Sequence, residues 1–186
     1  MPVARYTVIT MSCRSEDIIE FLLTRRSIRQ FKPDPVPDDL VLKIVDIARF
    51  APSAGNRQPW TFVVIKDKEL KDRLASLHSG SSPLLRAPVG IVVACDKNQS
   101  PISYQVDCAN ATMYIMFAAH ALGLGTVWLQ TLRNVEEIQK LLDLPENYVP
   151  IAIVALGYPA EKPQPRPRKP LEEIVYLNKF GSKYVT

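Results

Sequence analysis

Two short segments carry most of the side chains that could do chemistry. The first, Thr24 to Phe31 (TRRSIRQF), holds three arginines within five residues, together with a serine. The second, Ala51 to Trp60 (APSAGNRQPW), is polar and restricted by two prolines, and neither segment contains a carboxylate. The planar guanidinium of arginine binds phosphate or carboxylate through two parallel hydrogen bonds. These residue types therefore predict a binding site for an anionic ligand.

More arginines lie near the end of the sequence. Arg166 and Arg168 alternate with prolines in a tail that cannot form the interior of a sheet and is predicted to be an extended strap. If the fold brings this strap against Arg25, Arg26 and Arg29, the two segments enclose one phosphate. The alternative is a pair of solvated charged faces.

The polar loop offers a second kind of contact. Its glycine permits a tight turn, and Ser53, Asn56 and Gln58 can hydrogen-bond the edge of a polar heterocycle. Trp60, at the end of the loop, is expected to belong to the core. A rigid polar loop and a phosphate-binding cluster together suggest a nucleotide-like ligand that carries a ring.

Composition narrows the class of protein. A chain of 186 residues, 47% hydrophobic and 23% charged, is typical of one globular domain with a sizeable core. The net charge of +4 is mild, and the basic residues are not interleaved with aromatic ones, so a nucleic-acid-binding domain is the weaker hypothesis. No GxxxxGK[ST] or GxGxxG motif follows a strand, and neither GxSxG nor HExxH occurs.

The cysteines and the apolar runs bear on the compartment. Cys13, Cys95 and Cys108 are widely spaced without a CxxC pair, so the sequence predicts buried reduced thiols and neither a disulfide framework nor a metal site. No run of about 18 apolar residues predicts a membrane span, and the first ten residues are too few and too polar for a signal peptide. The expected compartment is the cytoplasm. Residues 1–14 are expected to be a loose arm, and Met11 could be the natural start.

Hydrophobic periodicity predicts the elements that position these residues. Helices are expected over residues 15–25, from 38 to a stop before 52, and over 67–77, 105–122 and 134–142. Strands are expected over 60–65, 88–95, 126–132 and 148–156. Ser15 is the predicted cap of the first helix. The long helix, apolar nearly all round, is expected to run through the core and to end at Gly123-Leu-Gly125.

The strands indicate an α/β or α+β sheet covered on both faces. Their continuous apolar character by itself favours a parallel sheet. Residues 15–186 are expected to form one domain, in which 159–186 is the strap and a short helix starts at Leu171.

Four motifs together resemble a known family. RRSIRQF, APSAGNRQPW, HALGLGTVWLQ and PRPRKPLEEIV occur in the order seen in the FMN-dependent nitroreductase family, over nearly the whole chain. The resemblance implies an α+β, three-layer fold in which helices pack a central, mostly antiparallel sheet. It implies a homodimer with FMN at the interface. It also implies hydride transfer from NADH or NADPH through the flavin to a nitroaromatic or quinone.

The resemblance further implies roles for individual residues. The first flavin-binding segment, for phosphate, ribityl chain and pyrimidine edge, corresponds to Arg25, Arg26, Ser27 and Arg29, and the phosphate ligands of the strap correspond to Arg166 and Arg168. The loop that the partner chain lays against the ring corresponds to Pro52, Ser53, Ala54 and Asn56, with Gln58 in the same region. The segment that passes the ring through backbone groups corresponds to Gly125, Thr126 and Val127. No catalytic side chain is expected, because protons can come from water.

One segment departs from the family pattern. Many members carry an asparagine and a lysine before the strand that corresponds to 88–95, where this chain reads HSGSSPLLRAP. Insertions are short, and 101–105 is the expected rim of an open pocket. Two other functions stay open: a specialised flavin enzyme of the same fold, and a flavin-binding protein without NAD(P)H turnover.

Overall fold

The structure is a computed structural model that describes residues 14–184. Its centre is a four-stranded sheet in the order β1-β2-β4-β3, and all neighbouring strands are antiparallel. The strands are β1 (Trp60–Ile65), β2 (Val89–Asp96), β3 (Gly125–Gln130) and β4 (Tyr148–Gly157). The parallel sheet that the apolar runs favoured is therefore wrong, whereas the antiparallel sheet that the resemblance implied is confirmed. The predicted arm 1–14 lies outside the described residues, apart from Arg14.

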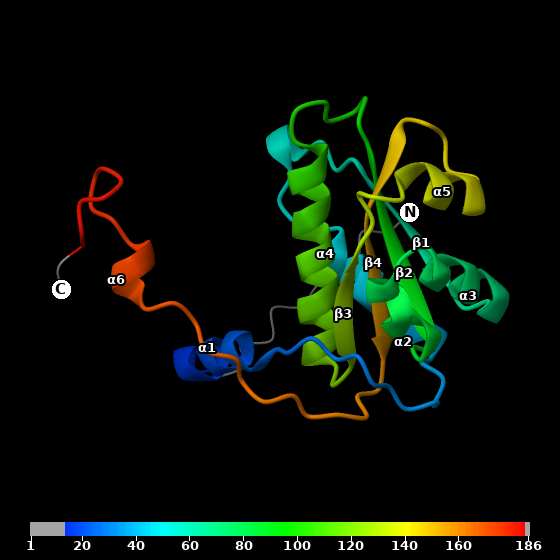
Figure 1. The fold of residues 1–186 in the computed structure, drawn as a ribbon, viewed down its shortest axis with the longest axis horizontal. Coiled ribbons are helices and arrows are strands. Elements are labelled where there is room, and N and C mark those ends of the chain that lie inside the picture. Colours follow the sequence, from blue (N-terminus) through cyan, green and yellow to red (C-terminus); the bar gives the residue numbers. More distant parts are fainter. Residues whose placement is uncertain (1–13, 185–186) are drawn as a thin grey trace, which may run out of the picture.

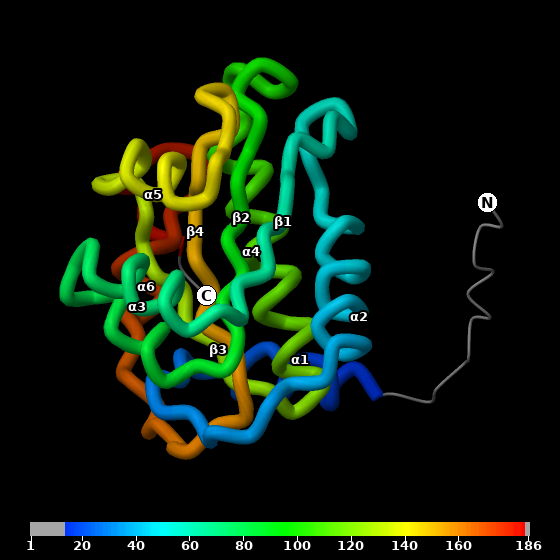
Figure 2. The backbone as a smooth tube through the Cα atoms, turned by 90° about the vertical axis from the view of Figure 1, so that its right-hand side faces the viewer, coloured from blue at the N-terminus to red at the C-terminus, as the bar shows by residue number. Residues whose placement is uncertain are grey.

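Helices cover both faces of the sheet and give three layers (Figure 1, Figure 2). One face carries α2 (Asp38–Ala48) and α4 (Tyr104–Ala121), and the other carries α3 (Lys68–Ser76), the 3-10 helix η2 (Ser79–Leu85) and α5 (Val135–Leu141). Further helices are α1 (Ser15–Thr24), η1 (Ala54–Asn56) and α6 (Leu171–Ile174). Because β2 and β4 are buried on both faces, their sequences are apolar regardless of strand direction. No helix within residues 14–184 is long and apolar enough to cross a membrane.

Two helices leave apolar faces uncovered by their own chain. α1 buries none of its residues, and its aliphatic side chains are at least half exposed: Ile18, Ile19, Leu22 and Leu23. α4 packs one face on the sheet and on α2, but Val106 on its other face is 62% exposed. The prediction that the long helix runs through the core therefore holds for one face only.

Capping determines where the helices near the arginines begin and end. Arg14 is the N-cap of α1, and its N–H donates to the carboxylate of Asp17 at 3.1 Å, so the predicted cap at Ser15 is wrong. α4 ends as predicted. Gly123 has a φ of +74°, and its N–H and that of Leu124 donate to carbonyls of the last turn at 3.1 and 2.8 Å. This Schellman motif turns the chain directly into β3.

The strap crosses the arginine segment before it leaves the body. Phe31 forms an antiparallel bridge with Pro159, and Lys32 N–H donates to Tyr158 O at 2.9 Å. The strap is extended as predicted, and α6 begins at Leu171. Residues 171–184, the C-terminal arm, stand away from the sheet (Figure 1). The arm exposes large hydrophobic side chains, which are Leu171, Ile174, Leu177, Phe180 and Tyr184.

Cys95 and Cys108 form a disulfide, so the prediction of reduced thiols is wrong for this pair. Their Cα atoms lie 6.0 Å apart, a normal spacing for a disulfide, and both residues are fully buried. The bond joins the end of β2 to the start of α4, which only the packing of α4 on the sheet brings together. Cys13 lies outside the described residues.

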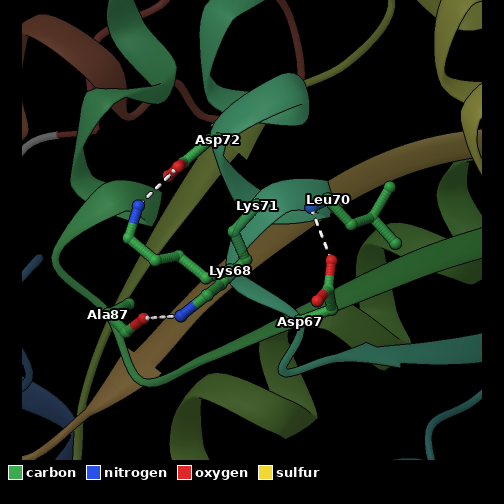
Figure 3. Close-up of polar contacts among 6 residues, drawn as sticks. All are labelled: Asp67, Lys68, Leu70, Lys71, Asp72 and Ala87. Carbon is green, nitrogen blue, oxygen red and sulfur yellow. Dashed lines mark hydrogen bonds and ion pairs between the residues drawn. The ribbon is translucent and has the colours of Figure 1, made fainter.

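A buried lysine fixes the turn that enters β2 (Figure 3). Lys71 Nζ donates to Ala87 O at 2.7 Å and to Pro88 O at 3.2 Å, and burial lowers the pKa of this amine. Next to this turn, Arg86 Nε donates to Arg29 O at 3.2 Å. The α3 layer therefore supports the backbone of the arginine segment.

Candidate functional site

The arginines that the sequence singled out gather around one cavity of about 160 Å³, which we call the arginine pocket. The segment that follows α1 and the strap form its walls. Its lining residues are Arg25, Arg26, Ser27, Arg29, Pro163, Gln164, Arg166 and Arg168. The structure therefore brings together the two basic segments that lie far apart in the sequence, rather than leaving them as two separate charged faces.

Backbone pairing on two sides holds the arginine segment in place. Ser27 forms a parallel bridge with Thr126 of β3, and the next N–H along the chain donates to Thr126 O at 2.9 Å. From the strap, Glu161 Oε1 accepts the backbone N–H groups of Arg29 and Gln30, the latter at 3.0 Å. The glutamate is thus used to fix the backbone of the segment.

The positive charge of the pocket is not neutralised by the described part of the chain. None of its arginines forms a salt bridge with a residue in 14–184. Arg25 Nη1 is buried and has no hydrogen-bond partner in the described part of the chain. Burial, followed by the charges of Arg26 and Arg168, lowers the pKa of Arg25. Because a buried cationic nitrogen without a partner is costly, the pocket fits a bound anion such as a phosphate.

β3 presents backbone groups along its outer edge. Since Ile28 N–H donates to Thr126 O, the alternation of an antiparallel strand turns the N–H and C=O groups of Trp128 and Gln130 to the same edge. Val127 points its backbone to β4 instead, and its side chain is buried. Sequence reasoning missed Trp128 and Gln130, because their orientation follows from the register of the strand and from no motif.

The segment that departs from the family pattern closes the far end of this edge. His78 Nε2 lies 2.8 Å from Gln130 O and 2.8 Å from Ser81 Oγ. A Cβ on Gly80 would lie 2.9 Å from the His78 ring, so this glycine lets the ring pack. The edge at Trp128 is therefore flanked by the arginine segment on one side and by η2 on the other. The sequence does not reveal this role of His78, because its partner Gln130 belongs to β3, which is distant along the chain.

The polar loop lies at the opposite end of α4. Asp107 Oδ1 accepts Ala54 N–H at 2.9 Å, and Asn110 Nδ2 donates to Pro52 O at 3.0 Å. About 20 Å of helix, at about 1.5 Å per residue, separates Asp107 from His120 at the arginine end. The loop and the arginine pocket of one chain therefore do not meet.

The loop has a constrained conformation. Asn56 and Gln58 adopt left-handed φ angles of +55° and +50°, and Ser53 Oγ accepts Gln58 N–H at 3.0 Å. Asp107 is buried, and its second oxygen accepts Ser100 Oγ–H at 2.7 Å. Backbone strain of this kind, at about 1 kcal/mol or more per residue, is kept where a site needs it. No motif in the sequence points to Asp107, because its partners Ala54 and Ser100 lie outside its helix.

Fold and site define a class of protein: a three-layer α+β domain with a cationic pocket where the strap crosses the sheet edge. The family model "Nitroreductase family" matches residues 22–82 and 76–158. A protein from Methanothermobacter thermautotrophicus, provisionally named NADH dehydrogenase/NAD(P)H nitroreductase, is 39% identical over 155 residues, which cover 81% of each chain. The chain belongs to the nitroreductase family.

Solved structures agree with this assignment. An FMN-dependent nitroreductase from Clostridium difficile matches with a TM-score of 0.80 at 32% identity, covering 87% of this chain and 99% of the other. A structure from Parabacteroides distasonis, also provisionally named NADH dehydrogenase/NAD(P)H nitroreductase, gives a TM-score of 0.83 at 28% identity and covers 87% and 98% of the two chains.

Proposed function

We propose that this protein is an FMN-dependent oxidoreductase that passes a hydride from NADH or NADPH through the flavin to nitroaromatic or quinone-type acceptors. The observation that carries the proposal is the buried Arg25 Nη1, which has no partner inside a pocket lined by arginines. The phosphate of FMN would supply the missing acceptor. The names of the relatives, an NAD(P)H nitroreductase and an FMN-dependent nitroreductase, support the reaction class.

The residues present fit FMN. Arg25, Arg166 and Arg168 would hold the phosphate, and Ser27 adds a hydroxyl donor. When bound, FMN supplies the chemistry, because its ring accepts and donates hydride. The outer edge of β3, from Thr126 towards Gln130, offers backbone donors and acceptors for the ring. Gly125 and Val127 belong to the same strand but turn their backbone groups to β4, so they would hold this edge in place without facing the ring.

We propose that Arg29 tunes the flavin. Its side chain lines the arginine pocket, while its carbonyl is held by Arg86 and its N–H by Glu161. A fixed positive charge next to the reduced ring stabilises the anionic form. No side chain is assigned a proton transfer, because water can provide the protons.

We further propose a homodimer in which each site uses both chains. The uncovered faces of α1 and α4, and the apolar side chains of the C-terminal arm, give the partner an apolar surface to cover. The polar loop and the arginine pocket lie at opposite ends of α4. A two-fold axis across α4 would therefore bring the loop of one chain to the pocket of the other. The loop residues that would face the partner's flavin are Pro52, Ser53, Ala54, Asn56 and Gln58.

The first experiment is the absorbance spectrum of the purified full-length chain, followed by anaerobic addition of NADH or NADPH. We expect bound yellow flavin that bleaches with at least one donor and recovers its colour when a quinone is added. An Arg25→Ala variant should lose the flavin, and Arg73→Ala, which removes an exposed arginine of α3, should keep it. A colourless protein that takes up no added FMN would reject the proposal. If the protein is yellow but neither NADH nor NADPH bleaches the flavin, the alternative of a flavin-binding protein without turnover would be favoured.

A heterodimer test addresses the shared site. Chains carrying Arg25→Ala and chains carrying Asp107→Ala, each with a different affinity tag, are co-expressed and the mixed dimer is isolated. If the loop serves the partner's pocket, one of the two sites contains neither change, and half of the wild-type flavin is retained. If the loop serves its own pocket, both sites are defective and the mixed dimer is colourless. A monomeric protein in solution would exclude the dimer.

Two further assignments belong to this proposal. Residues 15–186 act as one flavin-binding unit that includes the strap. The cytoplasm is the proposed compartment, because NADH and NADPH are intracellular reductants. Cell fractionation that finds the protein outside the cytosolic fraction would contradict this assignment.

A further inference from the structure

Two different elements of the fold hold the polar loop. Near the end of the loop, Asp96 of β2 donates its N–H to Pro59 O at 2.8 Å. Nearer its start, Asp107 of α4 accepts Ala54 N–H at 2.9 Å, and one turn further along α4 the Asn110 side chain donates to the loop as well. The conformation of the loop therefore depends on where the start of α4 lies relative to the end of β2.

The disulfide joins these two elements next to the residues that hold the loop. Cys95 directly precedes Asp96 in β2, and Cys108 directly follows the loop-binding carboxylate in α4. A second, weaker link runs through Ser100, whose N–H donates to Asp96 O at 3.3 Å and whose hydroxyl donates to Asp107 at 2.7 Å. The covalent bond is thus the strongest connection between the two supports of the loop.

Breaking the disulfide would displace these supports. Cys95 and Cys108 have no exposed surface and belong to the apolar core between the sheet and α4. Two separate thiols need more room than a disulfide, and a close-packed core has no spare volume for them. The extra room must come from a movement of the start of α4 away from the end of β2.

The loop would not keep its shape after such a movement. Gly55, Asn56 and Gln58 have left-handed φ angles of +57°, +55° and +50°. Two of these residues are not glycine, and a strained backbone of this kind persists only where the surrounding contacts impose it. The contacts with β2 and α4 supply this constraint, so a loop released from one of them should relax to ordinary backbone angles.

We propose that the disulfide between Cys95 and Cys108 is a redox switch that sets the conformation of the polar loop. A cellular dithiol is the reductant: its thiolate attacks one protein sulfur, and its second thiol then breaks the mixed disulfide. Two electrons and two protons pass to the protein, which gains two thiols, while the dithiol becomes a disulfide. Because both sulfurs are buried, the attack needs a transient opening of the largely exposed segment 97–103 between β2 and α4.

The compartment gives the switch its context. In the cytoplasm, which is the proposed compartment, thiol pools reduce most disulfides, and those that form there usually act in catalysis or redox sensing. The exceptions are the intracellular proteins of hyperthermophiles, in which disulfides are common. A permanent structural bond of that kind is the alternative that the experiment must distinguish.

The effect of the switch on flavin binding rests on the proposed function, because it takes the loop of one chain to face the flavin ring of the other. Release of the loop should weaken contacts with the ring and leave the arginine pocket unchanged. FMN and riboflavin share this ring and differ in the phosphate. They should therefore lose affinity by the same factor when the disulfide is reduced.

The test compares the oxidised full-length protein with the same protein in dithiothreitol, with thiols counted by alkylation and mass spectrometry and folding followed by circular dichroism. Hydrogen exchange in peptides of the polar loop should be at least about tenfold faster after reduction, whereas peptides of α5 on the other face of the sheet should not change. In flavin-free protein, the dissociation constants of FMN and riboflavin should both rise at least about threefold, because a loop that is no longer preorganised binds less tightly. Reoxidation with oxidised glutathione should restore both properties.

Variants assign the response to the pair. Protein carrying Cys95→Ala and Cys108→Ala together should match the reduced wild type in both measurements and should ignore dithiothreitol. Cys13→Ala is the matched control, because it removes the third cysteine and keeps the pair, and it should respond like the wild type. A response that disappears in Cys13→Ala would overturn the inference. If the double variant does not fold, the reduced wild type decides.

The outcomes separate this inference from the proposed function. A disulfide that stays intact in the folded protein, or whose reduction unfolds the chain, would be a structural bond and would overturn the switch. Unchanged hydrogen exchange of the loop after reduction would overturn it as well. If the exchange rises but both flavins bind as before, the effect on the ring is refuted. If neither flavin binds in either state, the proposed function fails, and hydrogen exchange alone decides whether the switch exists.

Discussion

Replacing Arg25 by methionine tests the role of the arginine pocket most directly. Methionine keeps much of the volume of the side chain but removes the buried guanidinium, whose Nη1 has no hydrogen-bond partner within residues 14–184. Removing one member of a buried, hydrogen-bonded charge pair costs about 2–5 kcal/mol. At about 1.4 kcal/mol per factor of ten, the FMN dissociation constant should rise about 30-fold to a few thousandfold.

Riboflavin makes this measurement specific, because it carries the same ring without the phosphate. Flavin-free Arg25→Met and wild-type protein are titrated with both ligands, and the change should be large for FMN and within about twofold for riboflavin. Arg25→Lys should fall between the two, because a point charge replaces a planar fork. Arg73→Met on the surface of α3 should change neither constant. An equal loss for riboflavin and FMN would refute the reasoning, because the effect would then not involve the phosphate.

The same variant predicts a change in stability with a definite sign. Burial, then Arg26 and Arg168, lower the pKa of Arg25, which means that folding disfavours its charged form. At ordinary pH, below both the folded and the unfolded pKa, the charged side chain therefore destabilises the flavin-free protein. Flavin-free Arg25→Met should melt no lower than wild type, and FMN should raise the melting temperature of wild type more than that of the variant. A clear drop in the flavin-free melting temperature would show that Arg25 is structural.

Four other changes have expected outcomes. Arg29→Ala should lower the flavin midpoint potential by about 20 mV, the equivalent of about 1 kcal/mol for two electrons. An unchanged potential would contradict the proposal that Arg29 tunes the flavin. Replacing Cys95 and Cys108 by alanine should cost about 3 kcal/mol and lower the melting temperature by about 6–12 °C, measured by calorimetry against the oxidised, disulfide-bonded wild type. Asp107→Ala should free the polar loop and weaken FMN binding, whereas Asp107→Asn, which keeps an acceptor, should restore much of it; equal losses would separate the loop from this carboxylate. The pKa of His120 is lower in the folded state than in the unfolded state, so below about pH 6.5 the unfolded state binds more protons than the folded state. The free energy of unfolding should therefore fall as the pH drops through this value. His120→Gln should reduce this pH dependence, measured by urea melts at pH 5–8.

Much of the candidate site can be predicted from the sequence. The grouping of arginines, the proline-rich strap and the stop at Gly123 depend on local residue types, and local physics decides them. The helices and strands can be predicted for the same reason. The spacing of apolar residues within one or two turns of chain indicates whether a segment is a helix or a strand. The family could be predicted as well, because four motifs together resemble it, whereas no single segment would have been sufficient.

Tertiary structure decided the rest, since each remaining feature joins residues that are distant in sequence. The antiparallel order of the sheet could not be predicted from strands that are buried on both faces, because burial hides the alternation that would show their direction. The bond between Cys95 and Cys108 requires α4 to pack on β2, and the position of His78 beside Gln130 requires the register of β3. Only the folded structure shows that Arg25 Nη1 is buried without a hydrogen-bond partner among the described residues. This observation indicates that the cluster of arginines is a binding site for an anion.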